Sequence, residues 1–190
     1  MLTMLEFRRK VFHIFSGIVV IILLSLGVIT RFELLILLIV GLIISPLSKK
    51  YKIPIVSWGL KKMDRKKMFM PGWGAITALA GMLIALYLFS ENIAYASILI
   101  LSVGDGFAAL IGKMGKMKTR FSKKKTWEGT ISGIITATIA ASFFVPLYMA
   151  LVASMVAMYV ELVDFKFKNI IDDNLLMPFI AGVIISLLML

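Results

Sequence analysis

The chain has 190 residues, of which 61% are hydrophobic and 16% charged, with a net charge of +11. A water-soluble fold of this length could not bury so much apolar surface, because surface area grows too fast relative to volume. The absence of cysteine excludes disulfides, thiolate metal sites and cysteine nucleophiles. The basic residues are concentrated in a few loops, which argues against a nucleic-acid groove.

Long apolar runs separated by short charged loops are typical of a helical membrane protein. Pro146 divides one run that is too long for a single span. No Ser/Gly-rich linker separates two domains, so we expect an all-α, polytopic fold with a single membrane domain over residues 1–190. The sequence predicts about seven transmembrane helices, at Val11–Ile29, Phe32–Leu47, Pro71–Phe89, Asn92–Ile111, Gly129–Val145, Leu147–Val163 and Leu175–Leu190.

The distribution of charge predicts the orientation of these helices. A cytoplasmic N-terminus places nearly every lysine and arginine on the cytoplasmic side, and Arg31 is the one exception in the short outer loops. Trp58, Trp73 and Trp127 then lie on that same side, as interfacial anchors do. We therefore expect a multi-pass protein of a prokaryotic cell membrane with its polar site facing the cytoplasm.

Asp105 is the most informative residue, because it is a lone carboxylate in the apolar run Asn92–Ile111. Ionisable groups at membrane depth are costly and usually functional. Ala108, Ala109 and Gly112 follow it on one helical face, and these small residues alone would indicate only close helix packing. Close packing does not account for the carboxylate, so Asp105 is the first candidate for a catalytic or metal-binding group.

A basic loop follows and ends in the segment Lys123–Thr130. A helix that begins near Glu128 would offer free N–H groups to an anion, and the Glu128 carboxylate could hold a divalent cation. The simpler interpretation of the loop lysines is contact with anionic headgroups. Lysines, cation and helix end together predict a triphosphate-binding site.

Further polar residues are expected on the same side of the membrane. Arg9 and His13 share one face of the first helix with Glu6 and Lys10, a pattern that an interfacial anchor with an ion pair would also explain. The remaining candidates near the cytoplasmic ends of later helices are Glu161, Asp173 and Asn174.

Together these residues resemble the polyprenol kinase family, which includes dolichol kinase, phytol kinase and the CTP-dependent diacylglycerol kinase. The chain is more distantly similar to CDP-diacylglycerol synthases. Thr130 stands where relatives often have Ser, and the chain is shorter than dolichol kinases, which leaves the length of the lipid open. The matching pieces are Glu6–His13, Gly104-Asp105 with Ala108, Gly112 and Gly115, Lys124–Thr130, Glu161, and Asp173-Asn174 with Pro178.

The resemblance implies a single catalytic domain that transfers the terminal phosphoryl group of CTP or ATP to the hydroxyl of an isoprenoid or other lipid alcohol. It implies catalytic roles for Asp105, Glu128 and Lys125. Mg²⁺ or another divalent cation would be held by Asp105, Glu128 and Glu161. The nucleotide would be bound by Lys123, Lys124, Lys125, Thr126, Gly129, Thr130 and Gly112, and the further candidates are His13, Arg9, Asp173 and Asn174.

Two other functions fit parts of the pattern. A CDP-lipid synthase, acting on a phospholipid such as phosphatidate, would use a similar site but release pyrophosphate and a CDP-lipid. An ion or solute transporter could use Asp105 and Glu161 as a relay. A transporter usually has polar groups near the midplane, whereas these acids gather at one face.

Overall fold

The chain is all-α in the computed structural model, which describes residues 4–51, 53–63, 70–122, 125–163 and 173–190, and the described residues form no β-strand. This confirms the all-α part of the expected fold class. In chain order the elements are α1 (Met4–Ser25), α2 (Arg31–Lys50), α3 (Pro54–Met63), α4 (Trp73–Leu88), α5 (Glu91–Leu99), the π-helical segment η1 (Ile100–Asp105), α6 (Gly106–Gly112), α7 (Trp127–Ala141), α8 (Leu147–Val163) and α9 (Asp173–Leu188).

Each of the seven apolar segments falls on a helix. Four of the helices end earlier than the sequence predicted, α1 and α7 by four residues each and α4 and α9 by one or two. α1 ends at Ser25 because Gly27 adopts a left-handed conformation (φ 67°) and closes a Schellman motif, with Val28 N–H donating to the Leu23 carbonyl at 2.9 Å. α7 ends at Ala141 and a turn leads to Pro146, which disfavours helix at the residue before it.

A local signal also accounts for the start of α2, and the structure adds one helix, α3, that the apolar runs did not predict. α2 begins with a capping box, in which the Thr30 hydroxyl accepts from the backbone and the Glu33 carboxylate accepts from Thr30 N–H at 2.8 Å. The short helix α3 follows α2 and carries Trp58 and Lys62 one turn apart.

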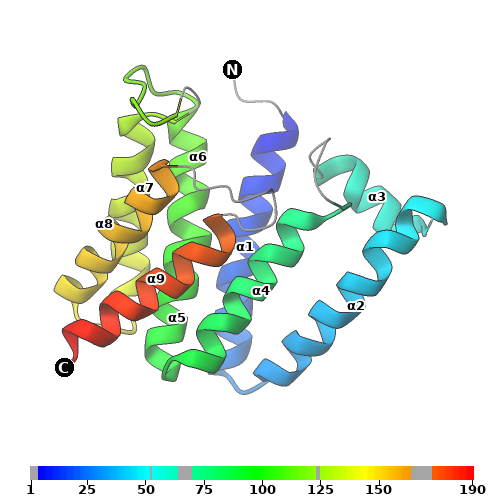
Figure 1. Ribbon diagram of the computed structural model, residues 1–190, viewed down its shortest axis with the longest axis horizontal. Helices are drawn as coiled ribbons and strands as arrows, with labels where there is room; N and C mark the ends of the chain where they lie inside the picture. The colour runs from blue at the N-terminus through cyan, green and yellow to red at the C-terminus, as the bar shows by residue number, and fades with distance from the viewer. Residues whose placement is uncertain (1–3, 52, 64–69, 123–124, 164–172) are drawn as a thin grey trace.

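The centre of the molecule is a continuous helix from Glu91 to Gly112, made of α5, η1 and α6. α1, α4, α7, α8 and α9 surround it, and α2 lies at the edge beside α4 (Figure 1). The central helix is mostly buried, whereas α2 exposes large apolar side chains such as Phe32 (61%) and Leu37 (56%). Exposed apolar surface of this extent usually marks contact with a membrane or a partner.

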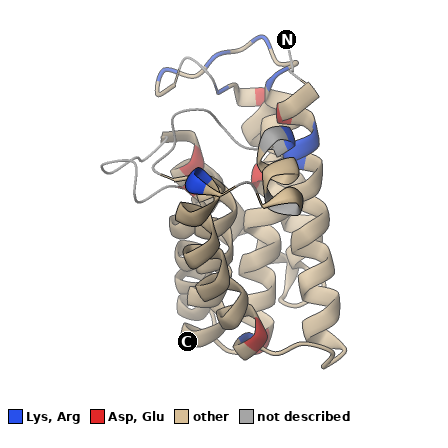
Figure 2. Ribbon diagram, turned by 90° about the vertical axis from the view of Figure 1, so that its right-hand side faces the viewer, with Lys and Arg blue, Asp and Glu red and all other residues tan. Residues whose placement is uncertain are grey.

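Two helices, Arg31–Lys50 and Glu91–Gly112, are long and apolar enough to cross a membrane, and three shorter ones (α4, α8 and α9) are also apolar. The start of α1 and the loop after α6 lie at one end of the bundle (Figure 1), and most of the charged residues gather at that end (Figure 2). A smaller charged group, with Arg31, Glu33 and Glu91, occupies the helix starts at the opposite end. We call the first end the basic end.

Candidate functional site

Asp105 is the last residue of the π-helical segment η1 and is only 4% exposed. Short π-helical stretches inside α-helices are rare and occur frequently at functional sites. Glycines around this segment let α1 approach closely. A Cβ added at Gly17 would lie 2.2 Å from the Ser102 hydroxyl, and one at Gly106 would lie 2.2 Å from Ile14. This contact brings the polar face of α1 to the Asp105 carboxylate.

Two side chains of α1 meet that carboxylate. The Lys10 ammonium donates a hydrogen bond to Asp105 Oδ2, and His13 Nε2 lies 3.7 Å from the same oxygen. His13 Nε2 is buried and has no hydrogen-bond partner in the described part of the chain. Buried polar atoms are usually satisfied. An imidazole nitrogen without a partner beside a buried carboxylate is therefore available to a ligand.

Two more acids complete the cluster from the other side of the site. Glu161, near the end of α8, and Asp173, the first residue of α9, have carboxylate oxygens within 4.8 Å of each other and of an oxygen of Asp105. Lys125 Nζ lies 2.6 Å from Glu161 Oε1 and 3.9 Å from Asp173 Oδ2, and it also donates to the Glu161 carbonyl. Five residues from distant parts of the sequence are thus brought together at the basic end.

The composition of this cluster suits a hard divalent cation. All three grouped acids offer carboxylate oxygens, which are the ligands that Mg²⁺ and Ca²⁺ prefer. Three carboxylates against the ammonium groups of Lys10 and Lys125 leave one negative charge in a largely buried site. A cation would reduce the cost of burying that charge.

The structure places Glu128 elsewhere, although the sequence predicted it as a metal ligand. Its carboxylate accepts hydrogen bonds from the backbone N–H groups of Lys116 (2.8 Å) and Met117 (3.0 and 3.2 Å). These bonds, the one from Met117 first, hold the pKa of the Glu128 carboxyl below its ordinary value. Glu128 therefore organises the loop after α6, and Asp173 takes the position that the sequence assigned to it.

Backbone N–H groups at the start of α7 also form hydrogen bonds within the protein itself. The Thr126 hydroxyl donates to the Gly112 carbonyl (3.0 Å) and accepts from Gly129 N–H (3.3 Å), while Thr130 N–H donates to the Thr126 carbonyl (3.1 Å). Trp127 N–H donates to the Met117 carbonyl at 2.9 Å. The sequence predicted that N–H groups at this helix start bind phosphate. In the structure they instead donate hydrogen bonds to atoms of the protein, where α6 and α7 meet.

The glycines of this joint serve close packing. A Cβ at Gly129 would lie 2.6 Å from the Ala108 carbonyl oxygen and from Gly112 Cα. A Cβ at Gly133, one turn further, would lie 2.9 Å from Ala108 Cβ. The face of small residues on the central helix thus packs against α7. This is the close helix packing that these small residues alone would indicate. Asp105, one residue after Gly104, is not explained by that contact.

The other predicted residues have separate positions. The Asn174 amide donates to the Gly74 carbonyl (3.2 Å) and to the Thr77 hydroxyl (3.1 Å), so it ties α9 to α4. Arg9 is partly buried on α1, next to the Lys10 that contacts Asp105. Lys123 and Lys124 lie outside the described residues.

Lys10 is the residue that the sequence interpretation passed over. Its position on the helical face that carries His13 was visible, because the two are three residues apart. Nothing in the sequence shows that this face would meet Asp105, since the contact joins residues 95 positions apart.

No family model and no solved structure matches the chain. Uncharacterized protein MJ1137 of Methanocaldococcus jannaschii is 36% identical over 189 residues, which cover 96% of this chain and 94% of that protein. The chain therefore belongs to the family of which Uncharacterized protein MJ1137 is a member.

Proposed function

We propose that this protein is a multi-pass membrane enzyme that transfers the terminal phosphoryl group of a nucleoside triphosphate to a lipid alcohol. The observation that carries the proposal is the buried cluster of Asp105, Glu161 and Asp173, flanked by Lys10 and Lys125, at the basic end of an apolar helical bundle. Phosphoryl transfer needs mainly positioning and charge stabilisation, which acids and lysines supply.

Several features support the membrane placement. Two helices are long and apolar enough to cross a membrane, and three shorter ones are also apolar. α1 and α7 expose large apolar side chains where a soluble protein would carry charges, such as Phe15 (65%) and Ile139 (58%). Lysines and arginines gather at the basic end (Figure 2), which favours a cytoplasmic location for that end. The site would then meet cytosolic nucleotide and the headgroup region of the bilayer at once.

The three grouped carboxylates are the proposed ligands of Mg²⁺ or a similar cation. When bound, such a cation would supply positive charge that stabilises the transferred phosphoryl group. Lys10 and Lys125 are the proposed phosphate-binding groups, because each ammonium lies at the edge of the cluster and can donate several hydrogen bonds. CTP is the favoured nucleotide on the resemblance of the sequence to polyprenol kinases.

Phosphoryl transfer to an alcohol requires one group on the protein that accepts the proton of the alcohol. The bond between the terminal phosphorus and its bridging oxygen breaks, a bond to the alcohol oxygen forms, and the alcohol gives up its proton. His13 Nε2 is the proposed acceptor, since it is buried, lacks a partner among the described residues and lies 3.7 Å from Asp105. The nucleoside diphosphate leaves with the electron pair of the broken bond.

The test uses purified protein in lipid vesicles with Mg²⁺ and a panel of isoprenoid alcohols, diacylglycerol and phosphatidate. CTP or ATP is labelled at the terminal phosphorus in one arm and at the α-phosphorus in the other. Label from the terminal phosphorus in an alcohol, with release of nucleoside diphosphate, is the expected result.

Two outcomes would contradict the proposal. Label from the α-phosphorus in phosphatidate, with release of pyrophosphate, would identify a CDP-lipid synthase instead. Absence of transfer to any lipid, together with Asp105-dependent solute flux into sealed vesicles, would identify a transporter.

A further inference from the structure

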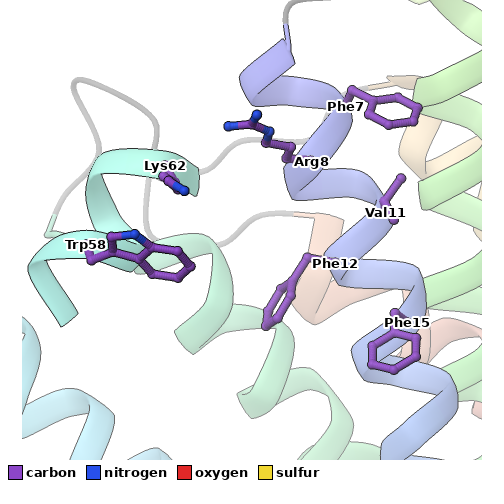
Figure 3. Close-up of a pocket in the computed structure, with 7 residues that line it drawn as sticks. All are labelled: Phe7, Arg8, Val11, Phe12, Phe15, Trp58 and Lys62. Carbon is purple, nitrogen blue, oxygen red and sulfur yellow. The ribbon is translucent and has the colours of Figure 1, made fainter. Parts of the chain in front are cut away.

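A second site lies on the opposite face of α1 from Lys10 and His13. A groove of about 360 Å³ separates α1 from α3, and Figure 3 shows its lining side chains. Val11, Phe12 and Phe15 of α1 form one apolar wall, and Trp58 of α3 forms the other. Phe12 (51%), Phe15 (65%) and Trp58 (58%) are all more than half exposed. The four apolar side chains of the two walls are thus accessible from outside the protein.

Two cations stand at one end of this groove. Arg8 comes from α1 and Lys62 from α3, and in Figure 3 both lie at the end nearest the N-terminus, beyond Phe12 and Phe15. Lys62 Nζ lies 4.4 Å from the centre of the Trp58 ring, a cation–π contact that fixes the ammonium beside the groove. No acidic residue lines the groove in the described part of the chain.

Phe7 also lines the groove, one residue before Arg8, and from Arg8 onward the order of these groups along α1 matches the order of groups in a phospholipid. Arg8, Val11, Phe12 and Phe15 follow one another at helical spacing on a single face, so charge gives way to apolar surface within two turns. The cations are at the basic end, where the headgroups would lie, and the phenylalanines are deeper. Tryptophan is the usual aromatic residue at this boundary.

We propose that this groove binds an anionic phospholipid of the surrounding leaflet. Arg8 and Lys62 hold its phosphate, and an acyl chain lies along Phe12 and Phe15. A basic residue near an anionic membrane surface favours contact by about fivefold, so two such residues predict a preference of roughly 25-fold over a zwitterionic lipid. The proposal rests on the membrane placement above and does not depend on phosphoryl transfer.

The experiment uses the fluorescence of Trp58, in protein that carries Trp73→Phe and Trp127→Phe so that Trp58 is the single tryptophan. The protein is placed in phosphatidylcholine vesicles that contain equal mole fractions of brominated phosphatidylglycerol or brominated phosphatidylcholine. Bromine quenches tryptophan only on close contact. We expect quenching at much lower fractions of the anionic lipid, and an excess of inorganic phosphate at constant ionic strength should leave this preference unchanged.

Substitutions then assign the preference to the two cations. Arg8→Gln with Lys62→Gln should remove it, while the control pair Lys118→Gln with Arg120→Gln, which changes the same charge on exposed residues of the loop after α6, should retain it. Circular dichroism checks that both proteins keep their helices. Equal quenching by the two lipids, an unchanged preference in the Arg8/Lys62 variant, or loss of the preference in inorganic phosphate would each overturn the proposal. None of these results bears on the labelled-nucleotide assay.

Discussion

Asp105 illustrates what a single residue requires of its surroundings. A buried carboxylate costs several kcal/mol unless it is paired. Here a neighbouring helix supplies the Lys10 ammonium, and His13 lies 3.7 Å away. An apolar residue at this position would stabilise the fold as well, because a buried ion pair rarely stabilises a protein more than apolar packing does. The presence of the ion pair at one end of an apolar bundle therefore supports the role in chemistry that we propose for Asp105.

Replacing Asp105 by Asn should remove a cation ligand while preserving volume and helix. We expect lipid phosphorylation to fall by at least about a hundredfold, as for loss of other groups that stabilise transition-state charge. Thermal unfolding should still be cooperative, but Mg²⁺ should no longer raise the unfolding temperature. Glu91→Gln, at the exposed far end of the same helix, is the matched control and should change neither property. Wild-type activity in the Asp105→Asn protein would reject the site.

Glu128 provides a pH prediction at the same scale. Its folded-state pKa lies below the ordinary value of 4.5, because the N–H groups of Met117 and Lys116 stabilise the ionised form. Its contribution to loop stability is therefore complete above about pH 4.5 and is lost as the pH falls through the lower folded value. We expect amide hydrogen-exchange protection of Lys116 and Met117 to decrease over that range.

Two controls isolate the carboxylate. In Glu128→Gln the protection of both amides should be lower and independent of pH in this range. The Thr119 amide, which donates to the Lys125 carbonyl at 3.0 Å, should not follow the titration. Pronounced pH dependence in the Gln variant would show that another group controls the loop.

At the scale of elements, the contact between α6 and α7 leaves no room for an added side-chain atom at Gly129. A Cβ at Gly129 meets backbone atoms, the Ala108 carbonyl oxygen and Gly112 Cα, both at 2.6 Å, and backbone cannot move aside as a side chain can. The two helices would have to separate by a few tenths of an ångström or more. That separation would also disturb the start of α7, where Thr126 bonds Gly112.

Gly129→Ala should therefore destabilise the protein by about 1–3 kcal/mol, the usual cost of overpacking. Gly74→Ala is the control, since Gly74 is also helical and has nothing within 4 Å of an added Cβ. That substitution should be neutral or stabilising by up to about 1 kcal/mol. Thermal unfolding in detergent measures both, and equal unfolding temperatures for the two variants would contradict the packing argument.

The distribution of charge over the whole molecule predicts its topology. The chain has no cysteine, so single cysteines can be introduced without removing any. Lys118→Cys lies at the basic end and Glu91→Cys at the opposite end, both at exposed positions. In intact cells a membrane-impermeant maleimide should label Glu91→Cys at once and Lys118→Cys only after the membrane is opened. Labelling of both from the same side would refute the orientation.

The amino-acid sequence by itself determined the helical class and the positions of the apolar helices, although not that of α3. Apolar runs of bilayer length can satisfy their backbone groups only by forming helices, and Gly27 and Pro146 end helices through their own backbone geometry. It also identified Asp105 and Glu161, because a carboxylate in an apolar run is conspicuous without any coordinates.

Only the tertiary structure decided which groups share the site. Glu128 and Asp173 are both acids beside a helix start, but the first is held by loop amides and the second meets Asp105 and Glu161. Lys10 belongs to the site because glycine contacts bring α1 against a π-helical segment. Successive side chains on a helix point about 100° apart. Which residue a side chain contacts therefore depends on how the whole helix is rotated and how closely it approaches its neighbour. Those are set by packing between distant segments, which no local pattern records.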